Sequence, residues 1–228
     1  IEIPLKLQLI ISLVCFSAIA LIAITGGWKM ADLFWSLWIT SLVSGYYFLL
    51  AGILPKINRT ELESRKAELG EPVFGSKCLS NSIFFFQAIE VVIQLIFFTI
   101  HFGLFHFLLS LFLNEFFPLI NHPSHLISNF FYFIQISMSN YWLVVLISLI
   151  GSLYWFQKIF LQEDQSHYTR AYSNVIKIIF GFILFSIIGW IDSSRIGLAV
   201  LFVFYYFPVS IIWEFSKRLR LKPANPEK

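Results

Sequence analysis

Residues 82–113 read SIFFFQAIEVVIQLIFFTIHFGLFHFLLSLFL, and this stretch decides the fold class. It contains one charged residue, Glu90, and no proline. About 20 mostly apolar residues suffice for a helix to cross the hydrocarbon core of a membrane. The apolar residues run on without alternating, which argues against a strand of a membrane β-barrel. The stretch therefore predicts a membrane-spanning α-helix, long enough to tilt or to bend near Gly103.

The rest of the chain has the same character. Hydrophobic residues make up 58% of the 228 positions and charged residues 13%, whereas a soluble domain carries about 25% charged residues. Windows long and apolar enough to span a membrane cover residues 7–25, 31–54, 82–113, 139–161, 171–191 and 196–216. We therefore predict a single all-α domain, a polytopic integral membrane bundle of about six transmembrane helices. The first window runs directly into further apolar sequence, so we interpret it as a retained span rather than a signal peptide.

The basic residues predict the orientation of this bundle. If the chain crosses the membrane six times, fourteen of its sixteen Lys and Arg residues fall on one side. They are Lys6, Lys56, Arg59, Arg65, Lys66, Lys77, Lys158, Arg170, Lys177, Lys217, Arg218, Arg220, Lys222 and Lys228. Only Lys29 and Arg195 fall on the other side. Since basic loops stay in the cytoplasm, both termini are predicted to be cytoplasmic.

Two cytoplasmic segments follow from this topology. In the loop at 55–80, the pattern from Thr60 to Glu63 matches a capping box and predicts a short polar helix that ends at Gly70 and Pro72. This helix is either a solvated surface helix or a docking site for a partner protein. The basic tail at 217–228 could bind anionic lipids.

Polar residues within the third span form one stripe. Gln87, Glu90, Gln94 and His101 follow at spacings of 3, 4 and 7, which places them on the same face of a helix. A carboxylate at membrane depth usually faces the bundle interior or a water-filled cavity. Lys177 in the fifth span is the natural partner of Glu90. The set predicts a polar knot between helices, a path for protons or solute, or side chains that snorkel to the lipid edge.

The remaining histidines are weaker candidates. His101 and His106 diverge by about 140° on a straight helix, so they cannot bind one metal ion together. His122 and His125 have a metal-like spacing in the loop on the outer side, but Pro123 favours an irregular turn. We therefore predict no metal and no cofactor, although the many Phe residues leave a bound lipid, quinone or pigment open. The Trp residues, Trp35 and Trp38 among them, are expected mostly as anchors at the membrane interface.

Three segments resemble a bacterial membrane-protein family known as domain of unknown function 6498. They are Gly27–Gly45 with its motif Asp32-Leu33-Phe34-Trp35, Phe97–Phe105 with His101 and Gly103, and Ala171–Lys177. The chain departs from that family's pattern at Phe102, Leu109 and Asn174, where Tyr, His and Arg are expected. The resemblance implies an integral membrane protein of the bacterial inner membrane and no assigned activity.

A second, more remote resemblance concerns catalysis. His101, His106 and Ser110 are spaced as in one helix of rhomboid intramembrane proteases, which also need a Gly-x-Ser-Gly turn and a later histidine. Here Gly151-Ser152-Leu153-Tyr154 lacks the final glycine, and no histidine follows His167. A serine without a base in reach is a weak nucleophile, so we predict no catalytic residue.

The sequence therefore favours a non-catalytic accessory or scaffold subunit of a larger membrane complex. Its expected partners are membrane lipids and other membrane subunits, not nucleic acid. The alternative is a transporter for protons or a small solute along a path formed by Glu90, Lys177 and His101.

Overall fold

The computed structural model describes residues 4–69, 76–119, 126–162, 167–188 and 194–220, which form eight α-helices and contain no strand. The all-α prediction is confirmed for these ranges. The helices are α1 (Leu5–Thr25), α2 (Met30–Leu69), α3 (Ser76–Phe116), α4 (Leu126–Gly151), α5 (Leu153–Gln162), α6 (His167–Ile188), α7 (Ser194–Tyr206) and α8 (Val209–Arg220). His122, His125 and the tail at 221–228 lie outside the described residues.

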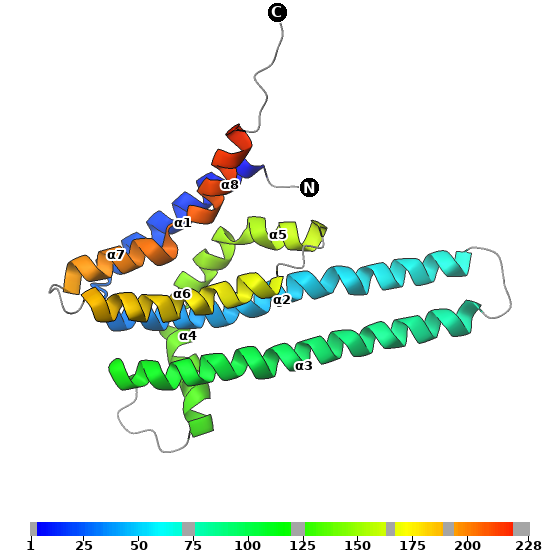
Figure 1. Ribbon diagram of the computed structural model, residues 1–228, viewed down its shortest axis with the longest axis horizontal. Helices are drawn as coiled ribbons and strands as arrows, with labels where there is room; N and C mark the ends of the chain where they lie inside the picture. Colours follow the sequence, from blue (N-terminus) through cyan, green and yellow to red (C-terminus); the bar gives the residue numbers. More distant parts are fainter. Residues whose placement is uncertain (1–3, 70–75, 120–125, 163–166, 189–193, 221–228) are drawn as a thin grey trace, which may run out of the picture.

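The two longest helices, α2 and α3, lie side by side and extend together beyond the other helices (Figure 1). With 40 residues, α2 is about 60 Å long, roughly twice the thickness of the hydrocarbon core of a membrane. The polar helix predicted to begin at Thr60 is instead the last part of α2, because the helix continues through Thr60 without a break. Likewise, α3 passes Gly103 as one continuous helix.

The fourth predicted span differs from the observed helices. The window at 139–161 crosses a break at Ser152, where α4 ends and α5 begins. Residues 129–137, which precede this window in the sequence, lie inside α4, where Asn129, Phe133 and Ser137 are buried. In Figure 1, α4 runs across the common direction of α2, α3 and α6 rather than alongside them.

The core is built around α2, which packs against α3, α4, α5 and α6. Trp35 and Trp38 are fully buried, so they do not anchor the protein at the membrane interface. Each indole N–H donates a hydrogen bond of 3.0 Å to a backbone carbonyl, from Trp35 to Phe117 and from Trp38 to His106. These bonds satisfy the polar group of each large side chain and hold α3 and the residue that follows it against α2.

A glycine permits a close approach of α2 and α3. A Cβ atom at Gly45 would overlap with the ring of Phe102, which is itself fully buried. Glycine also serves the turn between α1 and α2, where Gly27 has φ +60°, a conformation that residues with a Cβ rarely adopt. Two residues of the segments quoted for the family resemblance, Gly45 and Phe102, therefore pack directly on each other.

Four helical segments are long and apolar enough to cross a membrane: Leu5–Thr25, Met30–Leu54, Ala88–Phe116 and Ile127–Gly151. The pair Ile196–Tyr206 and Val209–Lys217, bent by 49°, would make a fifth span if it crosses as one unit. The described chain is therefore a helical bundle with four or five candidate membrane spans. Six spans and the side on which the termini lie stay predictions.

Candidate functional site

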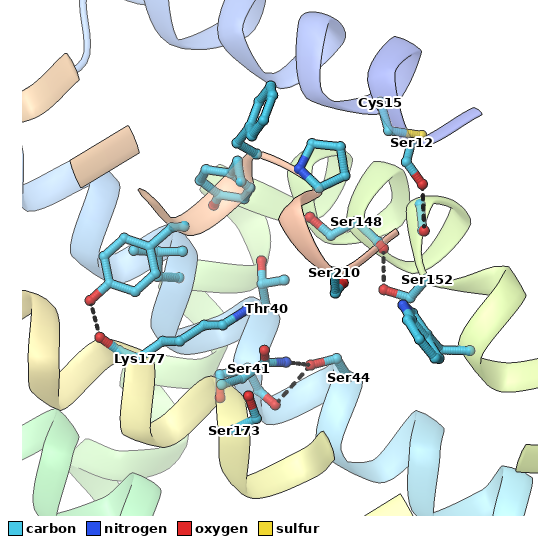
Figure 2. A pocket seen from close by; sticks show the side chains of 18 of the residues that line it. Ser12, Cys15, Thr40, Ser41, Ser44, Ser148, Ser152, Ser173, Lys177 and Ser210 are labelled. Atoms are coloured by element: carbon cyan, nitrogen blue, oxygen red, sulfur yellow. Dashed lines mark hydrogen bonds between the residues drawn. The ribbon is translucent and has the colours of Figure 1, made fainter. Parts of the chain in front are cut away.

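A polar cavity of about 250 Å³ lies where seven of the helices meet (Figure 2). The walls come mainly from α2 and α6, and the ends of α4, α5, α7 and α8 close them together with α1. The polar lining residues are Ser12, Thr40, Ser41, Ser44, Ser148, Ser152, Arg170, Ser173, Asn174, Lys177, Tyr205, Tyr206 and Ser210. Pockets that combine apolar walls with a few convergent polar groups are the default candidates for binding sites.

Helical periodicity brings the polar residues of α2 and α6 into the cavity. On α2 the lining residues are Leu37, Thr40, Ser41, Ser44 and Phe48, and on α6 they are Arg170, Ser173, Asn174, Lys177 and Ile178. Both sets follow spacings of three and four, so each forms one stripe along its helix. The two stripes face each other, since the Asn174 amide donates a hydrogen bond of 2.9 Å to the Ser44 hydroxyl.

The cavity lies near the middle of the candidate span of α2. Ser44 precedes the end of the segment Met30–Leu54 by ten residues, or about 15 Å along a helix. This equals about half the thickness of the hydrocarbon core. Asn174 of α6 bonds to Ser44 and therefore lies at the same depth in the membrane. Lys177 follows Asn174 by three residues, so it lies within one helical turn of this depth. An ionisable residue at this depth is a functional candidate by default.

Two breaks in the helices border the cavity. The first lies between α4 and α5, where Gln8 and Ser12 of α1 donate hydrogen bonds of 3.0 and 3.2 Å to the Gly151 carbonyl. The second is the 49° bend between α7 and α8 at Pro208, a residue that cannot continue the helical hydrogen bonds. Broken helices beside a polar midplane site are a recurring feature of membrane transporters.

Two basic residues line the cavity. Figure 2 shows the Lys177 side chain extending across it toward Thr40, while the Lys177 carbonyl accepts a hydrogen bond from the Tyr205 hydroxyl. The guanidinium carbon of Arg170 lies 3.3 Å from the centroid of the Trp155 ring. Lys158 also approaches this ring, at 5.4 Å, but is not among the lining residues.

The predicted stripe on α3 lies elsewhere. Glu90 is exposed and accepts a hydrogen bond of 2.8 Å from Gln94 on the same helix, and its carboxylate also acts electrostatically on Tyr168 of α6. His101 is exposed as well, and its Nδ1 atom lies 2.6 Å from the Tyr172 hydroxyl. The side chain of Gln87 lies outside the described part of the chain.

The predicted pair of Glu90 and Lys177 does not form in this structure. Tyr168, Tyr172 and Phe182 of α6 contact aromatic rings of α3, whereas Lys177 lies on nearly the opposite side of α6, in the cavity. Glu90 and His101 are therefore separated from Lys177 by the body of α6. The structure does not bring the three residues of the predicted path together.

His106 has a role in the core next to the cavity. It is fully buried, with Nδ1 3.0 Å from the Phe102 carbonyl and Nε2 3.2 Å from the Ser41 hydroxyl. Ser41 also lines the cavity, so His106 stands directly behind its wall. Ser110 donates to the Phe107 carbonyl at 2.7 Å, and Ser152 to the Ser148 carbonyl at 2.9 Å.

Within the described ranges, no three His, Cys, Asp or Glu side chains converge as ligands of a metal ion would. Comparisons of the chain with protein-family models, with curated proteins and with solved structures give no match.

Proposed function

We propose that the protein is a multi-pass membrane protein that binds a small polar solute in the cavity and carries it across the membrane. The observation that supports this proposal is the position of Lys177 in a cavity lined by hydroxyl groups at the midplane of α2. Keeping a charge at this depth costs free energy, and such residues commonly mark solute and ion pathways. The breaks at Ser152 and Pro208 supply two points at which helix ends could move around the bound solute.

For the membrane topology we propose the six-span arrangement with both termini in the cytoplasm of a bacterium, and with the protein in the inner membrane. The proposal rests on the distribution of Lys and Arg along the sequence. The arrangement of most helix ends in Figure 1 supports it, although α4 runs across the other helices. The start of α1, the end of α2, the start of α3, the end of α5 and the end of α8 lie toward the right and top of the view. The end of α1, the end of α3 and the start of α7 lie toward the left.

Thiol labelling tests whether the cavity is open to water from both sides of the membrane. In a background in which Cys15 and Cys78 are replaced by alanine, Ser173→Cys places a reporter in the cavity. A charged, membrane-impermeant thiol reagent should label it both in inside-out and in right-side-out vesicles. The matched control is Ile183→Cys, on the same helix but exposed on the outer surface of the protein. It should stay unlabelled, since the reactive thiolate does not form in lipid.

Each labelling pattern has a distinct meaning. Labelling of Ser173→Cys from both sides supports transport, because the cavity then opens alternately or continuously to each compartment. Labelling from one side only supports binding without transport. Protection from both sides would overturn the proposal, because a sealed cavity cannot receive a solute from water.

The second candidate is an accessory subunit without chemistry of its own. It is favoured by the extension of α2 beyond Leu54, which together with α3 forms a long hairpin outside the rest of the bundle (Figure 1). Replacement of residues 58–83 by a short Gly/Ser linker should release a partner subunit that co-purifies with the full chain in mild detergent. Extraction of the same preparation shows whether lipid, quinone or pigment is bound.

A further inference from the structure

The charge of the cavity indicates the class of its solute. Arg170 and Lys177 line it, and among the described residues of its lining there is no Asp or Glu. In the part of the chain that the structure describes, Lys177 forms no ion pair. We propose that the cavity binds a small oxyanion of the phosphate type, either as a free ion or as the headgroup of an anionic lipid. This inference rests on the proposed function, since it takes the cavity to be the solute site.

The two basic side chains reach the cavity in different ways. The Lys177 ammonium group extends across it from α6 toward Thr40 of α2 (Figure 2). The stacking of Arg170 on Trp155 fixes the plane of the guanidinium group. Its N–H bonds lie in this plane, so the directions in which it can donate hydrogen bonds are fixed as well. A flexible ammonium group and an oriented guanidinium group together match the two ways in which proteins bind phosphate.

Five of the ten hydroxyl groups that line the cavity fall into two sets. Ser12, Ser44 and Ser152 already donate to backbone carbonyls, so they cannot also donate to a bound anion. The buried hydroxyls of Thr40 and Ser148 also line the cavity, and neither forms a hydrogen bond of good geometry within the described residues, although Thr40 approaches the Tyr206 hydroxyl. An oxyanion would accept bonds from these two groups, which come from α2 and α4, and from Lys177. Buried polar groups without partners cost free energy, so such a ligand would also stabilise the folded protein.

Size and depth restrict the ligand further. A volume of about 250 Å³ equals that of roughly eight water molecules at ~30 Å³ each, which suits one small anion with a few waters. The cavity lies near the midplane of α2, whereas lipid headgroups lie at the membrane surface. Depth thus favours the free anion over the lipid headgroup, and the experiment separates the two.

The test uses the Ser173→Cys reporter in the full chain, purified in maltoside micelles. The rate of labelling by a neutral thiol reagent is measured with inorganic phosphate, with sulfate, or with chloride at the same ionic strength. A second series compares micelles containing phosphatidylglycerol with micelles containing phosphatidylcholine. Slower labelling with phosphate or sulfate than with chloride supports a free oxyanion. Slower labelling with phosphatidylglycerol alone supports the lipid headgroup.

Two lysine variants decide whether the protection comes from the cavity. Lys177→Met should weaken the apparent affinity for the anion about tenfold or more, the factor expected for the loss of a charge-assisted hydrogen bond. Lys177→Arg keeps the positive charge, so the anion should still slow the labelling of Ser173→Cys in this variant. Loss of protection in Lys177→Met alone is then due to the lost charge and not to misfolding. The matched control is Lys158→Met, which removes a cation that contacts the same Trp155 ring from outside the cavity and should change nothing.

The outcomes also separate this inference from the proposed function. A reporter that reacts at equal rates with and without every anion and lipid would overturn the oxyanion assignment while leaving an open cavity for a neutral solute. Equal protection in the wild-type and Lys177→Met backgrounds would likewise overturn it. A reporter that reacts under no condition would instead refute the proposed function itself.

Discussion

Replacing Gly45 by alanine should destabilise the contact between α2 and α3, although it adds only one methyl group. The new Cβ atom would overlap with the ring of Phe102. That ring has little freedom to move, because it stacks on Phe98 at 4.6 Å and contacts His106 at 4.3 Å and Tyr172 at 5.5 Å between ring centroids. Phe102 is also fully buried, so the helices themselves have to move apart.

The expected magnitude follows from two opposing effects. Overpacking a tight interior costs about 1–3 kcal/mol. Against this, alanine is a better helix former than glycine by about 1 kcal/mol. The second effect is removed by comparison with Gly103→Ala on α3, where an added Cβ atom would meet nothing within 4 Å. The difference between the two variants should therefore equal the overpacking cost alone, about 1–3 kcal/mol in favour of Gly103→Ala.

The assay is reversible unfolding of the purified protein in mixed micelles, followed by the loss of helical and tryptophan signals. A double variant, Gly45→Ala with Phe102→Leu, provides an internal check, since the smaller side chain makes room for the methyl group. Residues in contact typically show coupling energies of 0.5–3 kcal/mol. If Gly45→Ala is as stable as Gly103→Ala, or if the double variant shows no coupling, the close packing of α2 on α3 at this point is refuted.

Three further predictions concern other parts of the molecule. His106→Leu should lower the free energy of unfolding by about 1–3 kcal/mol, because it leaves the buried Ser41 hydroxyl without its partner. The double variant His106→Leu with Ser41→Ala should lose less stability than the two single variants lose together. Additive costs in this cycle would show that the two side chains do not interact. Glu90→Gln should change stability by no more than about 0.5 kcal/mol and leave labelling of Ser173→Cys unaltered, because Glu90 is exposed and lies on the other side of α6. A large effect on labelling would restore the predicted path through Glu90. Reporter fusions at Lys222 and within residues 118–126 should report opposite sides of the membrane, and the same side for both would contradict the six-span topology.

The helices could be predicted from composition because the bilayer imposes a simple rule on apolar length. The windows at 7–25 and 31–54 coincide closely with the apolar segments Leu5–Thr25 and Met30–Leu54. The prediction was less accurate where tertiary contacts decide the structure. The fourth predicted window begins at 139, yet Asn129 and Ser137, which precede it, are buried inside α4. Burial of polar residues against a neighbouring helix cannot be recognised in a single sequence.

The candidate site was missed for a related reason. Charged residues and histidines at membrane depth pointed to α3, whereas most of the polar residues that line the cavity are serine and threonine. Serine and threonine cost little free energy in a membrane helix, because their hydroxyls can donate to a backbone carbonyl of the same helix, as Ser44 does to the Ser41 carbonyl. A signal was nevertheless present, since Thr40, Ser41 and Ser44 on one helix and Ser173, Asn174 and Lys177 on another follow helical spacing. What the sequence lacks is the information that these two stripes face each other.

The bond between His106 and Ser41 also determines which groups the cavity can offer to a ligand. A carbonyl oxygen can only accept, so the Nδ1 atom of His106 must carry the proton that bonds to the Phe102 carbonyl. In the neutral ring, Nε2 is then an acceptor, and the Ser41 hydroxyl must donate to it. The Ser41 proton therefore points into the core, away from the cavity that the residue lines. Ser41 therefore offers no donor to a ligand in the cavity, so the packing of α3 on one face of α2 affects the chemistry available on the other.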